Sequence, residues 1–166
     1  MVKPKKHLGQ HFLKDENISE EIVSSLRGLD KTGTVLEIGP GTGALTKYFI
    51  DKEVNFIAFE VDEESIAFLA LNYPTINVVN QDILSCDFTL FKQKPITILG
   101  NFPYNISSQI LFKAIDYRSE VNQLVGMFQK EVAERVASPP GSKKYGILSV
   151  FIQAYFNTEY LFTVHE

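Results

Sequence analysis

The feature that most constrains the fold is a regular alternation of short apolar runs with amphipathic stretches. Five apolar runs are typical of buried strands, at Thr34–Ile38, Asn55–Glu60, Ile76–Val79, Ile96–Leu99 and Asn122–Phe128. The intervening and following stretches have helical spacing and predict helices at 42–51, 63–72, 105–117 and 129–137. This alternation predicts an α/β fold, with a mostly parallel sheet covered by helices on both faces. Such a sheet binds ligands beyond the carboxyl ends of its strands.

The flanking segments add three elements and one loop. A helix is predicted to open at Asn17–Ile22, with acids in its first turn and Gly28 near its end. Residues 138–146 are rich in proline, glycine and serine and predict a loop. A short helix over 147–156 and a strand near 159–164 complete the expected order.

Composition limits the class of protein. The 166 residues suit one domain, and a hydrophobic content of 45% is enough for a core. No apolar run approaches the roughly 18–20 residues of a membrane span, so we expect no membrane partner. The single cysteine, Cys86, fits a reducing compartment, which predicts a cytoplasmic protein. The three histidines, His7, His11 and His165, lack metal-ligand spacing, so no metal is predicted.

Charge is distributed unevenly along the chain. The net charge is −4, yet residues 1–14 carry Lys3, Lys5, Lys6 and Lys14 and no acid. A basic arm of this kind can contact phosphates locally while an acidic body keeps the protein soluble. A solubilising tail explains the same charges equally well, so charge alone leaves both interpretations open.

A glycine-rich turn follows the first predicted strand. Gly39, Gly41 and Gly43 alternate with other residues and allow the backbone to approach a ligand closely. The spacing differs from the Gly-x-Gly-x-x-Gly of dinucleotide-binding folds, and the Gly-Lys-Ser/Thr ending of a phosphate loop is missing. The turn therefore favours a ligand without phosphate, and S-adenosylmethionine suits it.

Acidic residues end the next two predicted strands. Glu60 is placed to accept hydrogen bonds from both ribose hydroxyls of a nucleoside. Asp82 can accept from the adenine amine of the same cofactor, and Ile83 can pack on its ring. Each residue alone is a weak signal, but their order on successive strands predicts an S-adenosylmethionine site.

The fourth predicted strand leads into Asn101-Phe102-Pro103-Tyr104. The Asn101 side-chain oxygen and the Pro103 carbonyl are two acceptors for the N–H bonds of an adenine amine. They would aim its lone pair at a sulfonium methyl group, so that positioning and electrostatics supply most of the acceleration. Tyr104 would stack on an adenine that has left its helix or loop. Phe128 is either a second stacking residue or an ordinary core residue.

These motifs together resemble the ribosomal RNA small-subunit adenine-N6,N6-dimethyltransferases. The resemblance covers essentially the whole chain and is carried by five segments: 6–13, 37–43, 101–107, 129–132 and 145–150. It implies a Rossmann-like class I S-adenosylmethionine-dependent methyltransferase fold. It also implies dimethylation of two adjacent adenosines near the 3′ end of 16S RNA, in the cytoplasm, during assembly of the 30S subunit. We expect a monomer.

The resemblance assigns roles to particular residues. The family's cofactor positions correspond to His11, Leu13, Gly39, Glu60, Asp82 and Asn101. The basic arm with Lys5 and Lys6, and the 138–146 loop with Lys143 and Lys144, would face RNA. Two positions depart from the family pattern: His11 is commonly Asn, and Phe102 is usually Leu or Ile. A histidine can still form hydrogen bonds, and we expect Phe102 to pack inward.

The C-terminal region is the largest departure from the family pattern. Family members continue through a last core strand and a small helical domain that helps to hold RNA. We therefore interpret residues 1–166 as the catalytic domain, truncated before the last strand and without the C-terminal helical domain. The expectation is that it binds S-adenosylmethionine but methylates ribosomal subunits poorly.

Two alternative functions remain open. The erythromycin-resistance type of enzyme dimethylates one adenosine of 23S RNA and shares the Asn-x-Pro-Tyr turn. A non-catalytic ribosome-assembly or transcription factor could retain the same fold. The Leu-Gly-Gln-His-Phe-Leu segment at 8–13 favours the small-subunit type, and the intact Asn101, Pro103 and Tyr104 argue against loss of catalysis. A DNA adenine methyltransferase is disfavoured, because those enzymes commonly use Asp-Pro-Pro-Tyr.

Overall fold

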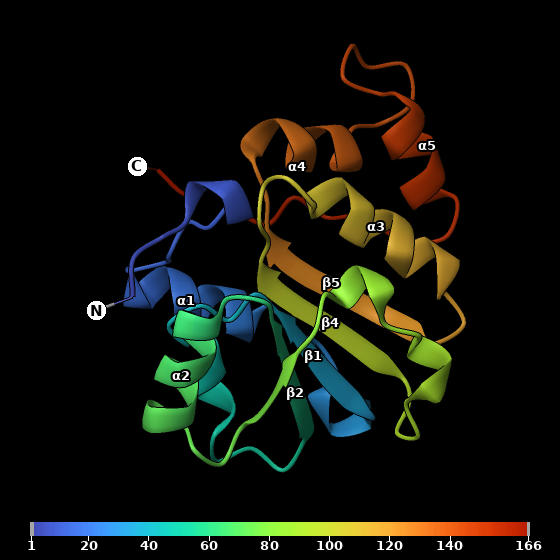
Figure 1. Cartoon of the computed structure of the whole chain (residues 1–166). Coiled ribbons are helices and arrows are strands. Elements are labelled where there is room, and N and C mark those ends of the chain that lie inside the picture. Colours follow the sequence, from blue (N-terminus) through green and yellow to red (C-terminus); the bar gives the residue numbers. More distant parts are fainter. Residues whose placement is uncertain (1, 166) are drawn as a thin grey trace.

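Five parallel strands form one sheet in the computed structural model, which describes residues 2–165 (Figure 1). Each strand is hydrogen-bonded only to parallel neighbours, in the order β3-β2-β1-β4-β5. The strands are β1 (Thr34–Ile38), β2 (Asn55–Glu60), β3 (Asn77–Asn80), β4 (Ile96–Asn101) and β5 (Val121–Met127). All five predicted strands are therefore confirmed, to within two residues at each end.

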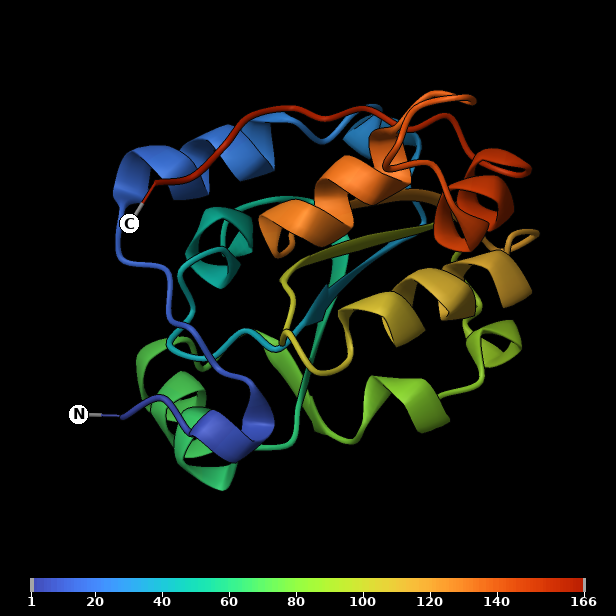
Figure 2. The same cartoon turned by 90° about the horizontal axis from the view of Figure 1, so that it is seen from above.

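Five α-helices of the described residues surround the sheet, and Figure 2 shows helices on both of its faces. They are α1 (Glu16–Ser24), α2 (Glu63–Asn72), α3 (Ser107–Asp116), α4 (Lys130–Ala137) and α5 (Ile147–Gln153). Asp15 caps α1 by accepting from the backbone N–H of Asn17 at 2.9 Å. The predicted helices at 63–72, 105–117, 129–137 and 147–156 are confirmed, the last with an earlier end.

The three inner strands, β2, β1 and β4, are buried on both faces, as a doubly covered parallel sheet requires. On one face, Leu36 and Ile98 pack against Ile110 of α3. On the other face, Val35 and Leu99 pack against α1 and the short 3₁₀ segment η3 (Thr46–Phe49). Helices α4 and α5 pack on the outer side of α3, around a smaller apolar cluster. Alternate residues of each strand thus serve two separate cores.

The prediction of a helix over 42–51 is wrong. The chain forms a series of turns over 41–45 and then only η3. Gly43 has a φ of +82°, which a right-handed helix excludes. Leu45 and Phe49 are nevertheless buried in the same cluster, so the apolar spacing was a real signal of burial on one face.

The prediction of a strand near 159–164 is also wrong. Residues 157–165 run as an extended segment in Figure 2 and include no strand. The segment makes side-chain contacts: Glu159 pairs with Arg27 at 2.7 Å, and Phe162 packs against the apolar cluster between the sheet and α1. A strand needs a hydrogen-bonded neighbour, and within residues 2–165 none pairs with this segment.

The strand order creates a natural ligand site. The chain winds outward from β1 to β2 and β3 on one side, and to β4 and β5 on the other. The loops that follow β1 and β4 therefore diverge at their carboxyl ends and leave a crevice at the switch point.

Candidate functional site

A cavity of about 230 Å³ lies at the carboxyl ends of β1, β2 and β4. Its walls combine the glycine turn, the ends of β2 and β3, the turn after β4 and part of the N-terminal arm, which we define as residues 2–14. Most of the predicted cofactor and catalytic residues line it: His11, Leu13, Gly39, Gly41, Glu60, Asp82, Ile83, Asn101 and Pro103. Residues from five separate segments are thus brought together.

The glycine turn forms one wall of the cavity. Gly39 and Gly41 have φ values of +65° and +56°, in the left-handed region that favours glycine. A Cβ atom on Gly41 would lie 2.9 Å from the ring of Phe12, which packs over the turn from the N-terminal arm. Glycine is therefore required here both by the backbone conformation and by the close approach of the arm.

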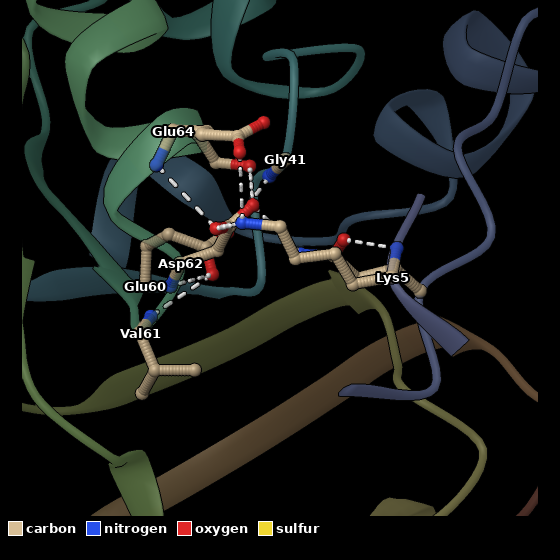
Figure 3. Close-up of polar contacts among 8 residues, drawn as sticks. Lys5, Gly41, Glu60, Val61, Asp62 and Glu64 are labelled. Atoms are coloured by element: carbon tan, nitrogen blue, oxygen red, sulfur yellow. Dashed lines mark hydrogen bonds and ion pairs between the residues drawn. The ribbon is translucent and has the colours of Figure 1, made fainter. Parts of the chain in front are cut away.

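Glu60 is held rigidly at the end of β2 (Figure 3). The residue is only 4% exposed, and its carboxylate accepts three backbone hydrogen bonds: from Gly41 at 3.1 Å, Val61 at 2.9 Å and Asp62 at 3.0 Å. These bonds satisfy part of its acceptor capacity and fix its orientation. The remaining lone pairs can accept from a diol in the cavity.

Glu37, on β1, is a cavity residue that sequence reasoning missed. It is 1% exposed, lines the cavity, and accepts a hydrogen bond from the Thr46 hydroxyl at 2.5 Å. Burial raises its pKa to about 8, against the lowering effect of Thr46 and with a further contribution from nearby Glu60. Its place inside an apolar strand concealed it, although an acid in such a run is itself a signal.

Asp82 and Ile83 follow β3 and form the far side of the cavity. Asp82 is exposed and caps the short helix η4 (Ile83–Ser85), accepting from the Leu84 N–H at 2.9 Å. Ile83 is 2% exposed and belongs to the apolar cluster between the sheet and α3. One residue thus presents a polar acceptor beside the cavity, while the next supplies an apolar floor.

The turn after β4 brings Asn101 and Pro103 to the same cavity. The Asn101 amide NH₂ donates to the His11 backbone carbonyl, so the amide oxygen is left to accept from another group. The Pro103 carbonyl accepts from the Ile106 N–H at 3.2 Å and keeps a second lone pair. Both acceptors proposed from the sequence are therefore available at the mouth of the site.

Tyr104 lies beside the cavity and is 37% exposed. Its ring stacks on the His11 imidazole, with centroids 4.4 Å apart and an angle of 24° between the planes. Phe102 is 1% exposed and packs against Phe128, with ring centroids 4.9 Å apart. The expectation that Phe102 packs inward is confirmed.

Phe128 is half-buried beside two of the apolar clusters. It also lines, together with Tyr104, a larger groove between β5, α4 and residues 156–165. Its position thus combines core packing with partial exposure in a groove shared with Tyr104.

The lysines predicted to face RNA differ in their surroundings. Lys6 and Lys143 are exposed, and Lys144 is exposed but pairs with Glu134 at 2.5 Å. Lys143 and Lys144 lie in the predicted 138–146 loop, which Figure 1 shows projecting beyond α4 and α5. Lys5 is instead half-buried, and its ammonium pairs with Asp62 and Glu64. Its contact with RNA stays a prediction, and its ion pairs indicate a role within the protein.

Two further properties bear on the class of site. Within residues 2–165, the side chains of histidine, cysteine, aspartate and glutamate do not gather in a group of three that could hold a metal ion. No helix in this part of the chain is long and apolar enough to cross a lipid bilayer.

The chain is similar to several proteins named as methyltransferases of ribosomal RNA or of adenosine. A protein of Flavobacterium johnsoniae named ribosomal RNA small subunit methyltransferase A is 53% identical over 99% of this chain. A dimethyladenosine transferase from Plasmodium falciparum has a TM-score of 0.69 and 30% identity, covering 86% of this chain and 52% of that chain. For the 23S rRNA methyltransferase ErmE the TM-score is 0.62 and the identity 27%, covering 79% and 53% of the two chains.

The solved structures show the fold, and a family model shows the family. The fold is that of the Rossmann-like S-adenosylmethionine-dependent methyltransferases, as the resemblance implied. The chain spans 64% of the length of its Flavobacterium relative. The family model described as ribosomal RNA adenine dimethylase matches residues 1–166, and the chain belongs to that family.

Proposed function

We propose that this chain transfers methyl groups from S-adenosylmethionine to N6 of two adjacent adenosines near the 3′ end of 16S rRNA. The setting is the assembling 30S subunit in the cytoplasm, and the protein acts as a monomer. The observation that carries the proposal is the convergence of Glu60, Asp82, Asn101 and Pro103 on one cavity. The names of the Flavobacterium relative and of the family support the RNA substrate.

The cavity fits S-adenosylmethionine chemically. Glu60 can accept from the ribose hydroxyls, Asp82 from the adenine amine, and Ile83 can pack on the adenine ring. Glu37 adds a second buried acid to the cavity wall. Because Gly41 has no side chain, the cavity wall beside Glu60 is formed by the backbone of the glycine turn.

The turn after β4 supplies the groups that act on the target amine. Bound S-adenosylmethionine supplies an electrophilic methyl group. In the first transfer to each adenine, the Asn101 side-chain oxygen and the Pro103 carbonyl would accept hydrogen bonds from the two N–H groups of N6, which favours a more tetrahedral nitrogen and directs its lone pair. After transfer, the nitrogen loses a proton to water. Tyr104 stacks on the ring of the extruded adenine. Phe128 is proposed for the opposite face, and Lys6, Lys143 and Lys144 for contacts with phosphates.

The test has two stages and uses the 166-residue chain. Titration calorimetry measures binding of S-adenosylmethionine. Single-turnover reactions with excess protein then measure methyl transfer to RNA carrying the 3′-terminal region of 16S, followed by mapping of methylated nucleosides by mass spectrometry. We expect binding, followed by slow formation of N6,N6-dimethyladenosine at the two adjacent positions.

The Asn101→Ala substitution tests the proposed chemistry. It removes one acceptor from the target amine while the strand that carries it stays buried, so transfer should fall by about 10²–10³-fold with little change in thermal unfolding. Full activity of Asn101→Ala would show that the amine is positioned otherwise. Methylation of 23S RNA alone would favour the erythromycin-resistance type, and binding without transfer to either RNA would favour a non-catalytic factor.

A further inference from the structure

Asp62 is a buried acid that the proposed chemistry does not use. It follows β2, is 3% exposed, and caps α2 by accepting from the Glu64 N–H. Its carboxylate pairs with the Lys5 ammonium and also accepts from Gln10 Nε2 at 3.3 Å and Ser65 Oγ at 2.9 Å. Figure 3 shows Lys5 reaching Asp62 from the N-terminal arm, beside Glu60 and Gly41.

A second contact stiffens the same part of the arm. The Lys5 backbone N–H donates to Gln10 Oε1 at 2.9 Å, so Gln10 ties together the arm backbone and Asp62. None of the three residues of the 3₁₀ segment η1 (Lys6–Leu8) is buried. Polar contacts with Asp62, rather than apolar burial, therefore anchor the first half of the arm.

The second half of the arm contacts the reacting side of the cavity. Phe12 packs on Gly41, while the His11 carbonyl receives the Asn101 amide and its imidazole stacks on Tyr104. The residues from Leu8 to Leu13 all line the cavity. The arm thus spans the site from the end of β2 to the end of β4.

We propose that Asp62 is a positioning residue, which holds the N-terminal arm across the cofactor cavity through Lys5 and Gln10. The held arm has two effects. It retains the cofactor, and it keeps the His11 carbonyl where it orients the Asn101 amide with its oxygen toward the target amine. This inference rests on the proposed use of the cavity for S-adenosylmethionine and of Asn101 for the amine.

The electrostatics of the pair agree with this role. Desolvation opposes ionisation of Asp62, but hydrogen bonds from Lys5, Ser65 and Gln10 outweigh it and lower its pKa to about 2. A buried carboxylate that loses its cation remains as an uncompensated charge, which is costly. Loss of Lys5 should therefore release the arm and draw water toward Asp62, rather than leave the arm in place.

The decisive experiment compares Lys5→Met with Lys5→Arg and Asp62→Asn. Asparagine is a good helix cap, so Asp62→Asn keeps the start of α2 while removing the charge. Lys94→Met is the matched control, since Lys94 forms a comparable ion pair with Glu120 at 2.6 Å, at the opposite end of β4. The measurements are the equilibrium and dissociation kinetics of S-adenosylmethionine, and hydrogen exchange of the amides at 8–13.

Lys5→Met and Asp62→Asn should each weaken cofactor binding by about tenfold through faster dissociation, and should speed exchange at 8–13. The double variant should be no worse than Asp62→Asn alone, because Asp62→Asn already removes the ion pair that Lys5→Met would remove. Lys5→Arg should bind S-adenosylmethionine about as tightly as the unsubstituted chain. Lys94→Met should leave both cofactor binding and hydrogen exchange at 8–13 unchanged.

Other outcomes separate this inference from the proposed function. Unchanged dissociation and exchange in Lys5→Met, with normal cofactor binding, would overturn the role of Asp62 while leaving the methyltransferase proposal intact. Failure of the unsubstituted chain to bind S-adenosylmethionine would overturn the proposed function itself. Faster exchange at 8–13 without any change in dissociation would show that the arm is anchored by Asp62 but does not retain the cofactor, which also refutes the proposal.

Discussion

At the scale of single residues, the site depends on acids whose surroundings differ sharply. Glu60 is fixed by three backbone N–H groups, Asp62 by a lysine, and Glu37 by one hydroxyl in a buried setting. These different partners give the three carboxyl groups different roles and protonation states. Glu60 presents lone pairs to the cavity, Asp62 holds the N-terminal arm, and Glu37 is protonated at neutral pH.

Glu37 makes the stability of the free protein depend on pH. Its pKa is raised from 4.5 to about 8 in the folded protein. The folded state therefore binds more protons than the unfolded state between these values. Its contribution to the free energy of unfolding is fully present below about pH 4.5 and is lost as pH rises through about 8. The loss should amount to a few kcal/mol, because one pKa unit corresponds to about 1.4 kcal/mol.

Glu37→Gln should remove this dependence, since glutamine does not titrate. Urea unfolding at pH 5.5 and pH 8 measures it: the unsubstituted chain should lose more stability than the variant over that interval. Parallel pH profiles for the two proteins would show that Glu37 titrates normally.

At the scale of elements, the pairing of β4 with β5 is shaped by one aromatic side chain. Gly100 and Gly126 lie opposite each other in the two strands, and Phe102 packs over both of them. Phe102 is the position where the family usually has Leu or Ile. The larger ring of Phe102 fits because Gly100 and Gly126 have no side chains, so the pairing of these two glycines leaves space for it.

Gly126→Ala should therefore destabilise the protein. An added Cβ would lie 2.1 Å from the Phe102 ring and 2.7 Å from the Gly100 carbonyl oxygen, with backbone on one side. Overpacking of this kind costs about 1–3 kcal/mol in the free energy of unfolding, measured by denaturant titration. Gly146→Ala is the comparison without a clash, because a Cβ there meets no atom within 4 Å; only the N-cap of α5 is weakened, at a cost of about 0.5–1 kcal/mol.

The double substitution Gly126→Ala with Phe102→Leu isolates the cause. The smaller side chain should recover part of the lost stability by relieving the clash with the ring. Two results would show that the clash with Phe102 is not the cause. One is a Gly126→Ala variant as stable as the unsubstituted chain, and the other is a double variant whose loss of stability equals the sum of the two single losses.

At the scale of the whole molecule, stability is graded across the sheet. β1 and β4 have hydrogen-bonded strands on both sides, whereas β3 and β5, among the described residues, have a neighbour on one side only. The sheet is also most deeply buried at its centre, where every residue of β1 is buried. β3 and most of β5 are only partly buried.

Native-state hydrogen exchange should follow this gradient. The amides of β1 and β4 should exchange slowest, near the rate of global unfolding, and those of β5 should exchange faster through local opening. Residue-resolved exchange by NMR measures the difference. Equal protection of β5 and β1 would show that the sheet opens only as a unit.

Local patterns predicted the elements well, and their failures have local causes. The strand runs were readable because strands buried on both faces form continuous apolar segments. The helix expected over 42–51 was wrong because apolar spacing reports which side chains are buried, while the positive φ of Gly43 decides the backbone path. The strand expected near 159–164 was wrong because pairing depends on a neighbour that no local window contains.

The same distinction between local and tertiary causes applies to the candidate site. The sequence by itself determined the glycine turn, the acid after β2, the Asn-Phe-Pro-Tyr turn and the succession of strands along the chain, because each depends on residue types within a few positions. Only the tertiary structure decided that Lys5 lies on Asp62, that the His11 carbonyl receives the Asn101 amide, and that Glu37 is buried beside Glu60. These contacts join residues far apart in the chain, and the packing of the sheet and the N-terminal arm sets the distances and the burial on which their charges depend.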